Sequence, residues 1–196
     1  MSYVELDTSI PIWERFLWVA PLVVIGTVEE DGTVDLAPKH MVTPLGWDNY
    51  FGFVCTPRHA TYRNAIREGS FTVSYPRPGQ LVHASLAAAP RCDDGRKASL
   101  SGLPVVAAQR VPGPLLAGAY LQLECTLDRV VEGFGENGLV VGKIVAARVH
   151  RSAERARELE DERLVEESPL LVYLAPGQFA RVAESHSFPL PSGFRR

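Results

Sequence analysis

The fold is decided by residues 50–76, which read YFGFVCTPRHATYRNAIREGSFTVSYP. Residues 50–55 are aromatic and β-prone and predict a strand that ends at Thr56-Pro57. Residues 70–75 alternate polar with apolar side chains, which is the period of a half-buried strand. Between the two strands we expect a short helix, with Thr61 as its N-cap and Gly69 as its end.

Polar residues gather where this helix begins, namely Thr56, Arg58, His59 and Thr61. A helix N-terminus presents unpaired N–H donors and a partial positive charge. With a guanidinium and two hydroxyl groups added, such a site suits a phosphate. A solvated turn with an ordinary helix cap is the alternative, and the spacing by itself favours that alternative.

The composition is that of a globular protein large enough for one core. The chain has 196 residues, of which 46% are hydrophobic and 22% are charged, and its formal net charge is -3. That charge gives no reason to expect nucleic acid or an anionic membrane surface as a partner. The apolar run 16–27 contains Pro21 and is too short to cross a bilayer. Three cysteines without a CxxC pair, and an N-terminus without a basic signal region, favour reduced thiols in the cytoplasm.

Most of the chain carries strand patterns joined by short turns. The continuous apolar run 22–28 predicts a central strand, which an Asp-Gly turn at 29–33 connects to a returning strand at about 34–42, with an irregularity at Pro38. Further strands are expected at 119–132, 139–150 and 170–174. The predicted fold is therefore mainly β, a closed or partly closed β-barrel with peripheral helices. A doubly wound α/β fold is the weaker alternative, because the helices do not alternate regularly with the strands.

The connecting segments complete a single predicted domain, 1–196. We expect a lead-in over 1–18, with the apolar residues of 9–20 packed onto the core, and an extended tail over 185–196. Short helices are expected at 80–89 and 153–166. The segment 91–114 is rich in Gly and Pro and predicts a long loop, and loops of that length are often functional. Lys97, within this loop, is interpreted as an ordinary surface residue.

Motifs for other kinds of chemistry are missing from the sequence or lie in the wrong context. Residues 133–138, GFGENG, match the dinucleotide fingerprint, but a β-patterned run follows, so a hairpin loop is predicted. The five histidines are scattered without metal-ligand spacing, so no metal site is expected. No nucleophile with its own base is recognisable, and no catalytic residue is predicted. His40 is polar in an apolar strand, and a backbone hydrogen bond at a strand end and a ligand contact are equally open for it.

Five stretches together carry a resemblance that covers about residues 18–190. They are 20–27 with the Asp31-Gly32 turn, 37–41, 56–64 running into 69–73, 123–125 with 140–145, and 169–174. The stretch 56–73 is the most specific of them. In their order and motifs they resemble the flavin reductase-like, FMN-binding split-barrel family that includes flavoredoxin.

The resemblance implies an FMN-binding split barrel that forms a homodimer, with one FMN per subunit near the dimer interface. The apolar residues of 103–121, which one small barrel is not expected to bury, also favour a dimer. The FMN phosphate is expected at Thr56, Arg58, His59, Thr61 and Asn64. The isoalloxazine is expected along Lys39, His40, Met41, Val42 and Thr43.

The function that the resemblance implies is an FMN-dependent oxidoreductase, a flavin reductase that uses NAD(P)H, in which the flavin carries the chemistry. A non-enzymatic flavoprotein electron carrier, and a split barrel that binds another ligand such as haem, are the alternatives. Three departures from the family pattern concern the substrate. Asp35 stands where many members have Asn, His40 where many have Ser, and Phe179 near a common Tyr. Because His40 is bulkier than Ser, it is a candidate substrate-pocket residue.

Overall fold

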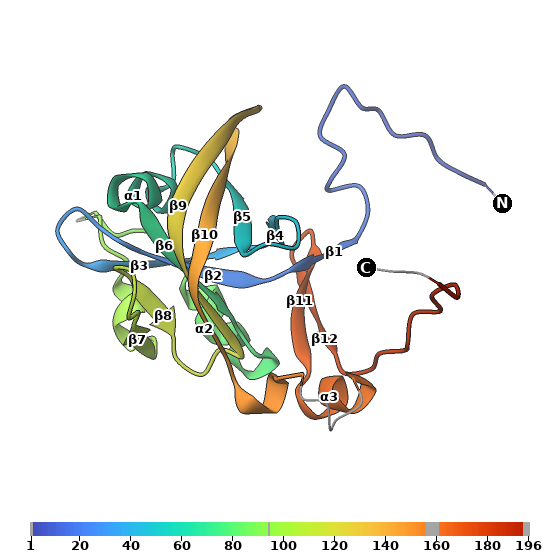
Figure 1. Cartoon of the computed structure of the whole chain (residues 1–196). Helices are drawn as coiled ribbons and strands as arrows, with labels where there is room; N and C mark the ends of the chain where they lie inside the picture. The colour runs from blue at the N-terminus through green and yellow to red at the C-terminus, as the bar shows by residue number, and fades with distance from the viewer. Residues whose placement is uncertain (1, 94, 156–160, 194–196) are drawn as a thin grey trace.

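One curled sheet of seven strands, in the order β3-β2-β6-β9-β10-β5-β4, forms the framework of the chain (Figure 1). A three-stranded sheet, β1-β11-β12, and the pair β7-β8 lie beside it. This computed structural model describes residues 2–93, 95–155 and 161–193. The mainly β, half-open barrel with few helices confirms the predicted fold class. The doubly wound alternative is wrong, because each strand pairing in the described residues is antiparallel.

The strands are β1 (Trp18–Pro21), β2 (Val23–Val28), β3 (Val34–Lys39), β4 (Val42–Pro44), β5 (Tyr50–Cys55), β6 (Ser70–Tyr75), β7 (Val105–Ala107), β8 (Pro114–Leu116), β9 (Leu121–Phe134), β10 (Asn137–Val149), β11 (Leu170–Ala175) and β12 (Gln178–Val182). The α-helices are α1 (Ala60–Glu68), α2 (Leu81–Leu86) and α3 (Asp161–Glu167), and the 3-10 helices are η1 (Pro78–Gln80), η2 (Ala98–Gly102) and η3 (Arg151–Ala153). Of the predicted helix 153–166, residues 156–160 lie outside the described residues.

The segment β5-α1-β6 confirms the strand, helix and strand predicted for residues 50–76. Gly69 ends α1 in the left-handed conformation, with φ +62, as expected. The prediction of Thr61 as N-cap is wrong. The helix begins at Ala60, His59 is its N-cap without a side-chain cap hydrogen bond, and Thr61 is buried in the first turn. The backbone N–H groups at the start of α1 therefore donate no hydrogen bond to the side chain of the N-cap residue.

Strand β2 is buried on both faces, which explains its continuous apolar sequence. Val23 and Ile25 belong to the core cluster inside the curled sheet, whereas Leu22 and Val24 belong to a second cluster against α2 and the segment 98–116. At Gly26 a Cβ atom would lie 2.1 Å from the carbonyl oxygen of Pro114, so only glycine at this position allows β2 and β8 to approach so closely.

Two predicted hairpin turns are confirmed, and one strand differs from its prediction. Residues 29–33 turn the chain between β2 and β3, and residues 133–138 turn it between β9 and β10. The returning strand is interrupted after Lys39 and not at Pro38, which pairs with Val24. Pro38 is tolerated because β3 is an edge strand of the sheet, where a missing N–H donor breaks no pairing.

The segment 91–114 contains regular structure, since η2 and β7 lie within it. It covers the outer face of the sheet, and Leu103, Leu115 and Leu116 are buried there. The expectation that 103–121 leaves its apolar residues uncovered is therefore wrong for these residues, although Val105 and Val106 remain partly exposed.

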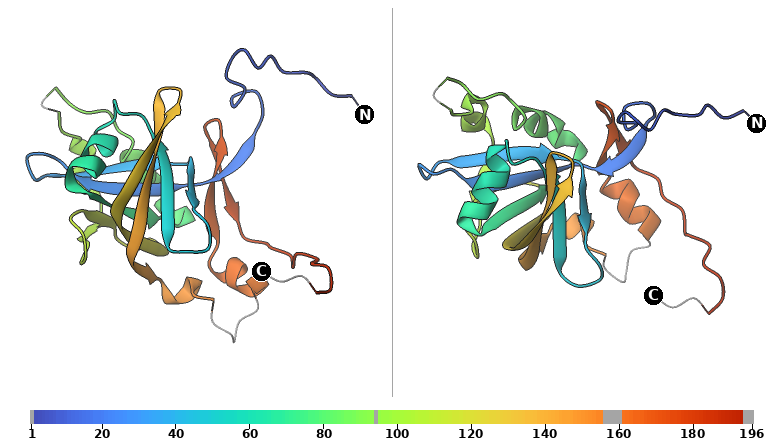
Figure 2. Two further views of the ribbon diagram at one scale, coloured as in Figure 1. Left: turned by 45° about the horizontal axis from the view of Figure 1, so that its top comes forward. Right: turned by 90° about the horizontal axis from the view of Figure 1, so that it is seen from above.

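Both terminal segments extend away from the body (Figure 2). The lead-in does not pack onto the core as predicted, because Trp13 and Leu17 are 54% and 59% exposed. Its Trp13 ring contacts Trp18 at a centroid distance of 5.7 Å. The C-terminal segment is extended, as expected, and exposes Phe188. Within the described residues, no helix combines the length and hydrophobicity that a membrane crossing requires.

Candidate functional site

Two cavities meet at strand β3, one basic and one apolar. The basic cavity, of about 460 Å³, lies between β3, the start of α1 and the segment 87–91. The apolar cavity, of about 350 Å³, lies between β3, α2 and the β11-β12 hairpin. Pro38 and Ala88 line both cavities. The two cavities are therefore adjacent and differ in chemistry.

The basic cavity carries an excess of positive charge. Among the described residues, the side chains of five Lys and Arg residues line it, against the single carboxylate of Asp35. These five are Lys39, Arg58, Arg63, Arg91 and Lys97. Burial lowers the pKa of His59 from its ordinary value, and the positive charges of Lys39, Lys97 and Arg63 lower it further. The cavity is therefore short of negative charge, which an anionic ligand would supply.

The turn before α1 is fixed by its own side chains. Arg63 Nη1 donates to the carbonyl oxygens of Arg58, at 2.6 Å, and Pro57, at 3.2 Å. Cys55 Sγ lies 3.8 Å from His59 Nδ1. Burial raises the pKa of the Cys55 thiol, so this pair does not form an activated nucleophile. The backbone of the turn is thus held by side-chain hydrogen bonds, and the Cys55–His59 pair is not an activated nucleophile.

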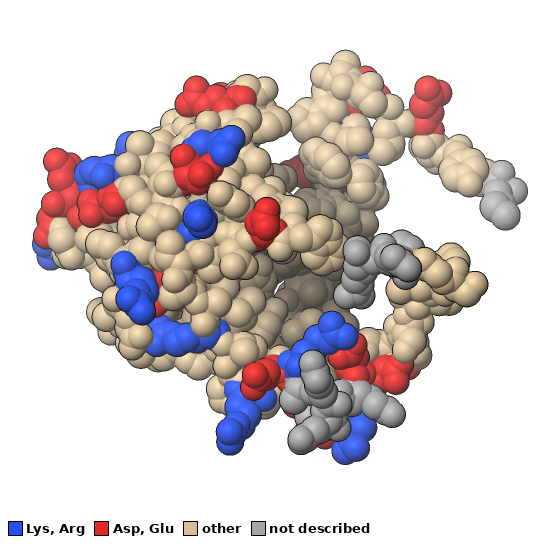
Figure 3. Space-filling view, viewed as in Figure 1, with Lys and Arg blue, Asp and Glu red and all other residues tan. Residues whose placement is uncertain are grey.

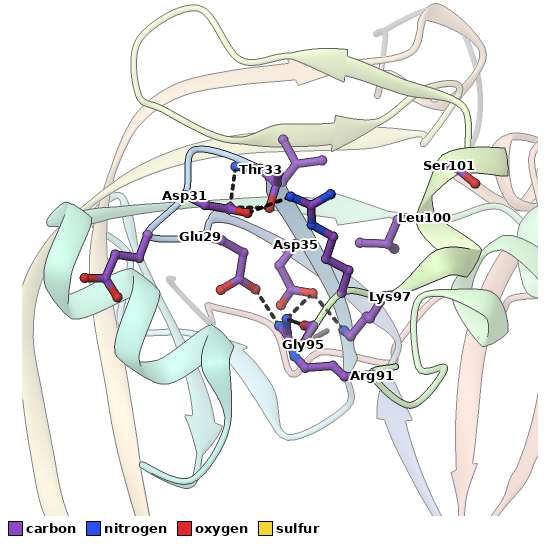
Figure 4. A pocket seen from close by; sticks show the side chains of 12 residues that line it. Glu29, Asp31, Thr33, Asp35, Arg91, Gly95, Lys97, Leu100 and Ser101 are labelled. Atoms are coloured by element: carbon purple, nitrogen blue, oxygen red, sulfur yellow. Dashed lines mark hydrogen bonds and ion pairs between the residues drawn. The ribbon is translucent and has the colours of Figure 1, made fainter. Parts of the chain in front are cut away.

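The far wall of the basic cavity is a buried ion-pair cluster around Asp35, which is 2% exposed. Lys97 Nζ lies 2.9 Å and Arg91 Nη2 lies 3.3 Å from Asp35 Oδ1. Arg91 also pairs with Glu29, so it lies between two carboxylates (Figure 4). Lys97 further donates to the carbonyl oxygens of residues 36 and 87. Its side chain is only 11% exposed, so the interpretation of Lys97 as an ordinary surface residue is wrong.

Aromatic rings form one side of the apolar cavity. The ring of His40 lies 4.6 Å from that of Tyr173 and 5.7 Å from that of Trp18, measured between centroids. Phe179 also lines this cavity, and no lining residue that the structure describes carries a formal charge. Burial, and to a lesser extent Lys39, lowers the pKa of His40, so its imidazole is neutral near pH 7. This end of the site suits an uncharged planar group.

The structure brings half of the predicted site residues to the two cavities. Lys39, Arg58, His59 and Thr61 line the basic cavity, and His40 lines the apolar one. Thr56, Met41, Val42, Thr43 and Asn64 line neither.

The residues that line neither cavity have other contacts. Val42 packs in the core. Asn64 is buried behind the helix start, where it donates to Thr27 Oγ1 at 3.2 Å and accepts from Arg67 at 3.0 Å. Thr56 Oγ1 accepts from the backbone N–H of Arg58 at 3.4 Å. These contacts position the turn around the site.

Sequence reasoning missed several residues that line the site, above all Arg63, Arg91, Tyr173 and the segment 87–90. Arg91 could have been predicted from the sequence, because it begins the long segment 91–114, and the length of that segment suggests a functional role. Tyr173 carries no such pattern, since it occupies an ordinary position in a strand. Across residues 2–93, 95–155 and 161–193, no three His, Cys, Asp or Glu side chains are grouped as a metal site would require.

Comparisons with known proteins agree on one family and one fold. The model of the family described as flavin reductase like domain matches residues 17–181. Flavoredoxin from Methanosarcina acetivorans superimposes with a TM-score of 0.78 at 18% identity, over 98% of both chains. An FMN-binding protein from Thermus thermophilus, solved with bound p-hydroxybenzaldehyde, gives a TM-score of 0.75 at 22% identity, over 96% of this chain and 100% of the other. An NADH:FAD oxidoreductase from Streptomyces globisporus gives 0.70 at 17% identity, over 92% and 97%.

Proposed function

Because the chain belongs to the family of flavin reductase-like domains, we propose that it binds FMN and acts as an oxidoreductase that takes electrons from NAD(P)H. One observation carries the proposal: a basic cavity and an apolar, ring-lined cavity share Pro38 and Ala88. FMN has the same two-ended chemistry, with a phosphate at one end and a planar ring system at the other. The two ends of the site and of the ligand therefore correspond.

The residues of the basic cavity fit a phosphate. Lys39 and Arg63 form no ion pair with a carboxylate in the described part of the chain, so their charges are available to an anion. His59 lines the same cavity and offers a ring nitrogen for a hydrogen bond. The first N–H groups of α1 add donors and a partial positive charge. Lys39, Arg58, His59 and Thr61 would hold the phosphate, and Asp35 with its two partners would close the wall behind it.

The apolar cavity fits an isoalloxazine ring and a planar partner. Bound flavin supplies the hydride and electron transfer, which no side chain of this protein has to perform. The chain's own residues bind and orient, because His40, Tyr173 and Phe179 offer ring faces and exclude water. Neutral His40 is a hydrogen-bonding group here and not a charge. A protein that only binds and orients the flavin needs no catalytic side chain of its own, which agrees with the lack of a recognisable catalytic group in the sequence.

Two comparisons support the choice of ligand and donor. The Thermus thermophilus structure is described as an FMN-binding protein, and the Streptomyces globisporus protein as an NADH:FAD oxidoreductase. Both share the fold of this chain. A non-enzymatic electron carrier is the second candidate function, because the same two-ended site would serve it. Oxidation of NADH or NADPH by the FMN-loaded protein distinguishes the two.

We further propose a homodimer in the cytoplasm. Apolar side chains on both terminal segments, such as Trp13, Leu17 and Phe188, remain more than half exposed within the chain. A hollow lined mainly by uncharged residues lies between the rounded body and these segments (Figure 3). A second copy of the chain would cover such surfaces through an isologous contact. Cys55, Cys92 and Cys125 are free thiols, which agrees with a reducing compartment.

Titration of the flavin-free protein with FMN and with riboflavin tests the proposed site. The two ligands share the ring and the ribityl chain and differ in the phosphate. We expect FMN to bind at least about tenfold more tightly, because one charge-assisted hydrogen bond is worth about 1.5–3 kcal/mol. Equal affinities would refute the assignment of the basic cavity to the phosphate.

A further inference from the structure

The tip of the β9-β10 hairpin contacts the turn that begins α1. Arg58 Nη2 donates to Glu136 Oε1 at 2.8 Å, although 78 residues separate the two in the sequence. The same hairpin contacts α1 a second time, because Tyr62 OH donates to Glu132 Oε1 at 3.1 Å. The glycine-rich loop 133–138 therefore lies next to one of the expected phosphate ligands.

Arg58 is thus the point where the hairpin and the basic cavity meet. Arg58 lines that cavity, whereas Glu136 is not among its lining residues. A guanidinium that donates to a carboxylate has fewer N–H groups and less charge to offer a phosphate. The two side chains are 76% and 68% exposed, so water and salt weaken their attraction. Such a pair can position the Arg58 side chain when no ligand is bound, and a more highly charged anion can still displace Glu136 from it.

We propose that Glu136 is a specificity-determining residue of the flavin site, which competes with the flavin phosphate for Arg58. The inference rests on the proposed function, since it requires a phosphate at α1. A phosphate monoester carries up to two negative charges and three acceptor oxygens, so it displaces the carboxylate. Part of the free energy of FMN binding then compensates for the loss of the ion pair between Glu136 and Arg58. A flavin without a phosphate leaves that pair intact, so Glu136 affects FMN and not riboflavin.

The Glu136→Gln variant tests the competition, because it keeps the size of the side chain and removes its charge. At low ionic strength we expect its Kd for FMN to be about two- to fivefold lower than that of the wild type, and its Kd for riboflavin to be unchanged. Glu132→Gln is the matched control. It removes one charge from the same hairpin but leaves the Arg58 pair in place, so its Kd for FMN should change less.

A double-mutant cycle assigns the effect to Arg58. Arg58→Ala should weaken FMN binding about ten- to a hundredfold, and Glu136→Gln should have no effect in that background. An unchanged Kd for FMN in Glu136→Gln, an equal gain in Glu132→Gln, or a gain that persists without Arg58 would each overturn the competition and leave the phosphate site standing. If the wild type binds FMN no more tightly than riboflavin, the proposed function fails and this inference fails with it.

Discussion

Lys97 Nζ lies 2.9 Å from Asp35 Oδ1, and this contact joins the long segment after α2 to the strand that carries the site. Asp35 is nearly inaccessible to water, so its charge is stable only while its cationic partners are in place. The same Lys97 contributes to the charge that lowers the pKa of His59. Lys97 thus compensates the buried charge of Asp35 and also contributes to lowering the pKa of His59.

Replacement of Lys97 by Met should destabilise the protein by about 3 kcal/mol, because it leaves the buried Asp35 without its closest partner. The free energy of unfolding is measured by urea denaturation. Lys143→Met is the matched control, since Lys143 lies exposed on β10 and should change stability by less than about 0.5 kcal/mol. A cost for Lys97→Met as small as that of the control would show that the buried pair is not required.

Binding of FMN should be coupled to protonation of His59. In the free protein, burial and the charges of Lys39, Lys97 and Arg63 lower the pKa of His59 from 6.5. A phosphate beside it would raise that pKa, because it adds negative charge. A group whose pKa is higher in the complex binds more protons there, so its contribution to affinity grows as pH falls toward the pKa of the complex and is lost above it.

This coupling is measured by calorimetric titration near pH 6.5 in buffers of different ionisation enthalpy. Wild type should take up more protons per FMN bound than His59→Gln, and the comparison removes the contribution of the phosphate's own titration. Identical proton uptake in the two proteins would place His59 away from the bound phosphate.

His40→Ser should alter the reaction with the electron donor more than it alters FMN affinity. The substitution removes a ring that stacks on Tyr173 in the apolar cavity, and an aromatic contact is worth about 0.5–1.5 kcal/mol. We therefore expect kcat/KM for the donor to change about two- to tenfold, with little change in the Kd for FMN. The measurements are steady-state oxidation of NADH and NADPH and titration with FMN. A loss confined to FMN binding would assign His40 to the cofactor and not to the donor pocket.

The mass of the protein in solution should be twice that of one chain. The apolar residues of the two terminal segments motivate this prediction. Multi-angle light scattering at micromolar concentration measures the mass directly. As a second measurement, removal of residues 2–16 should raise the monomer fraction. A wild-type mass equal to one chain would contradict the dimer.

Local patterns in the sequence predicted most of the strands and both hairpin turns, because alternation and glycine-containing turns are properties of neighbouring residues. The segment 50–76 is the clearest case, and its error of two residues at the start of α1 arose because Thr61 is buried in the first turn and does not cap the helix. The anion site proposed at this helix start could be predicted for the same reason, since its polar residues are close in sequence.

Long-range pairs could not be predicted in this way. Lys97 and Asp35 are 62 positions apart, and nothing near either residue shows that they are buried together. The pairing of Arg58 with Glu136 was hidden for the same reason. The lead-in was wrongly expected to pack onto the core, because its apolar composition shows that it needs cover but not which surface supplies that cover.

The central claim is that bound flavin accepts electrons from a nicotinamide donor. It is tested most directly by the visible spectrum of the FMN-loaded protein, mixed without oxygen with NADH and, separately, with NADPH. We predict that at least one donor abolishes the flavin absorption at ~450 nm. If neither donor does so while dithionite bleaches the same sample, the protein is not an NAD(P)H-dependent reductase, and the electron-carrier function takes its place.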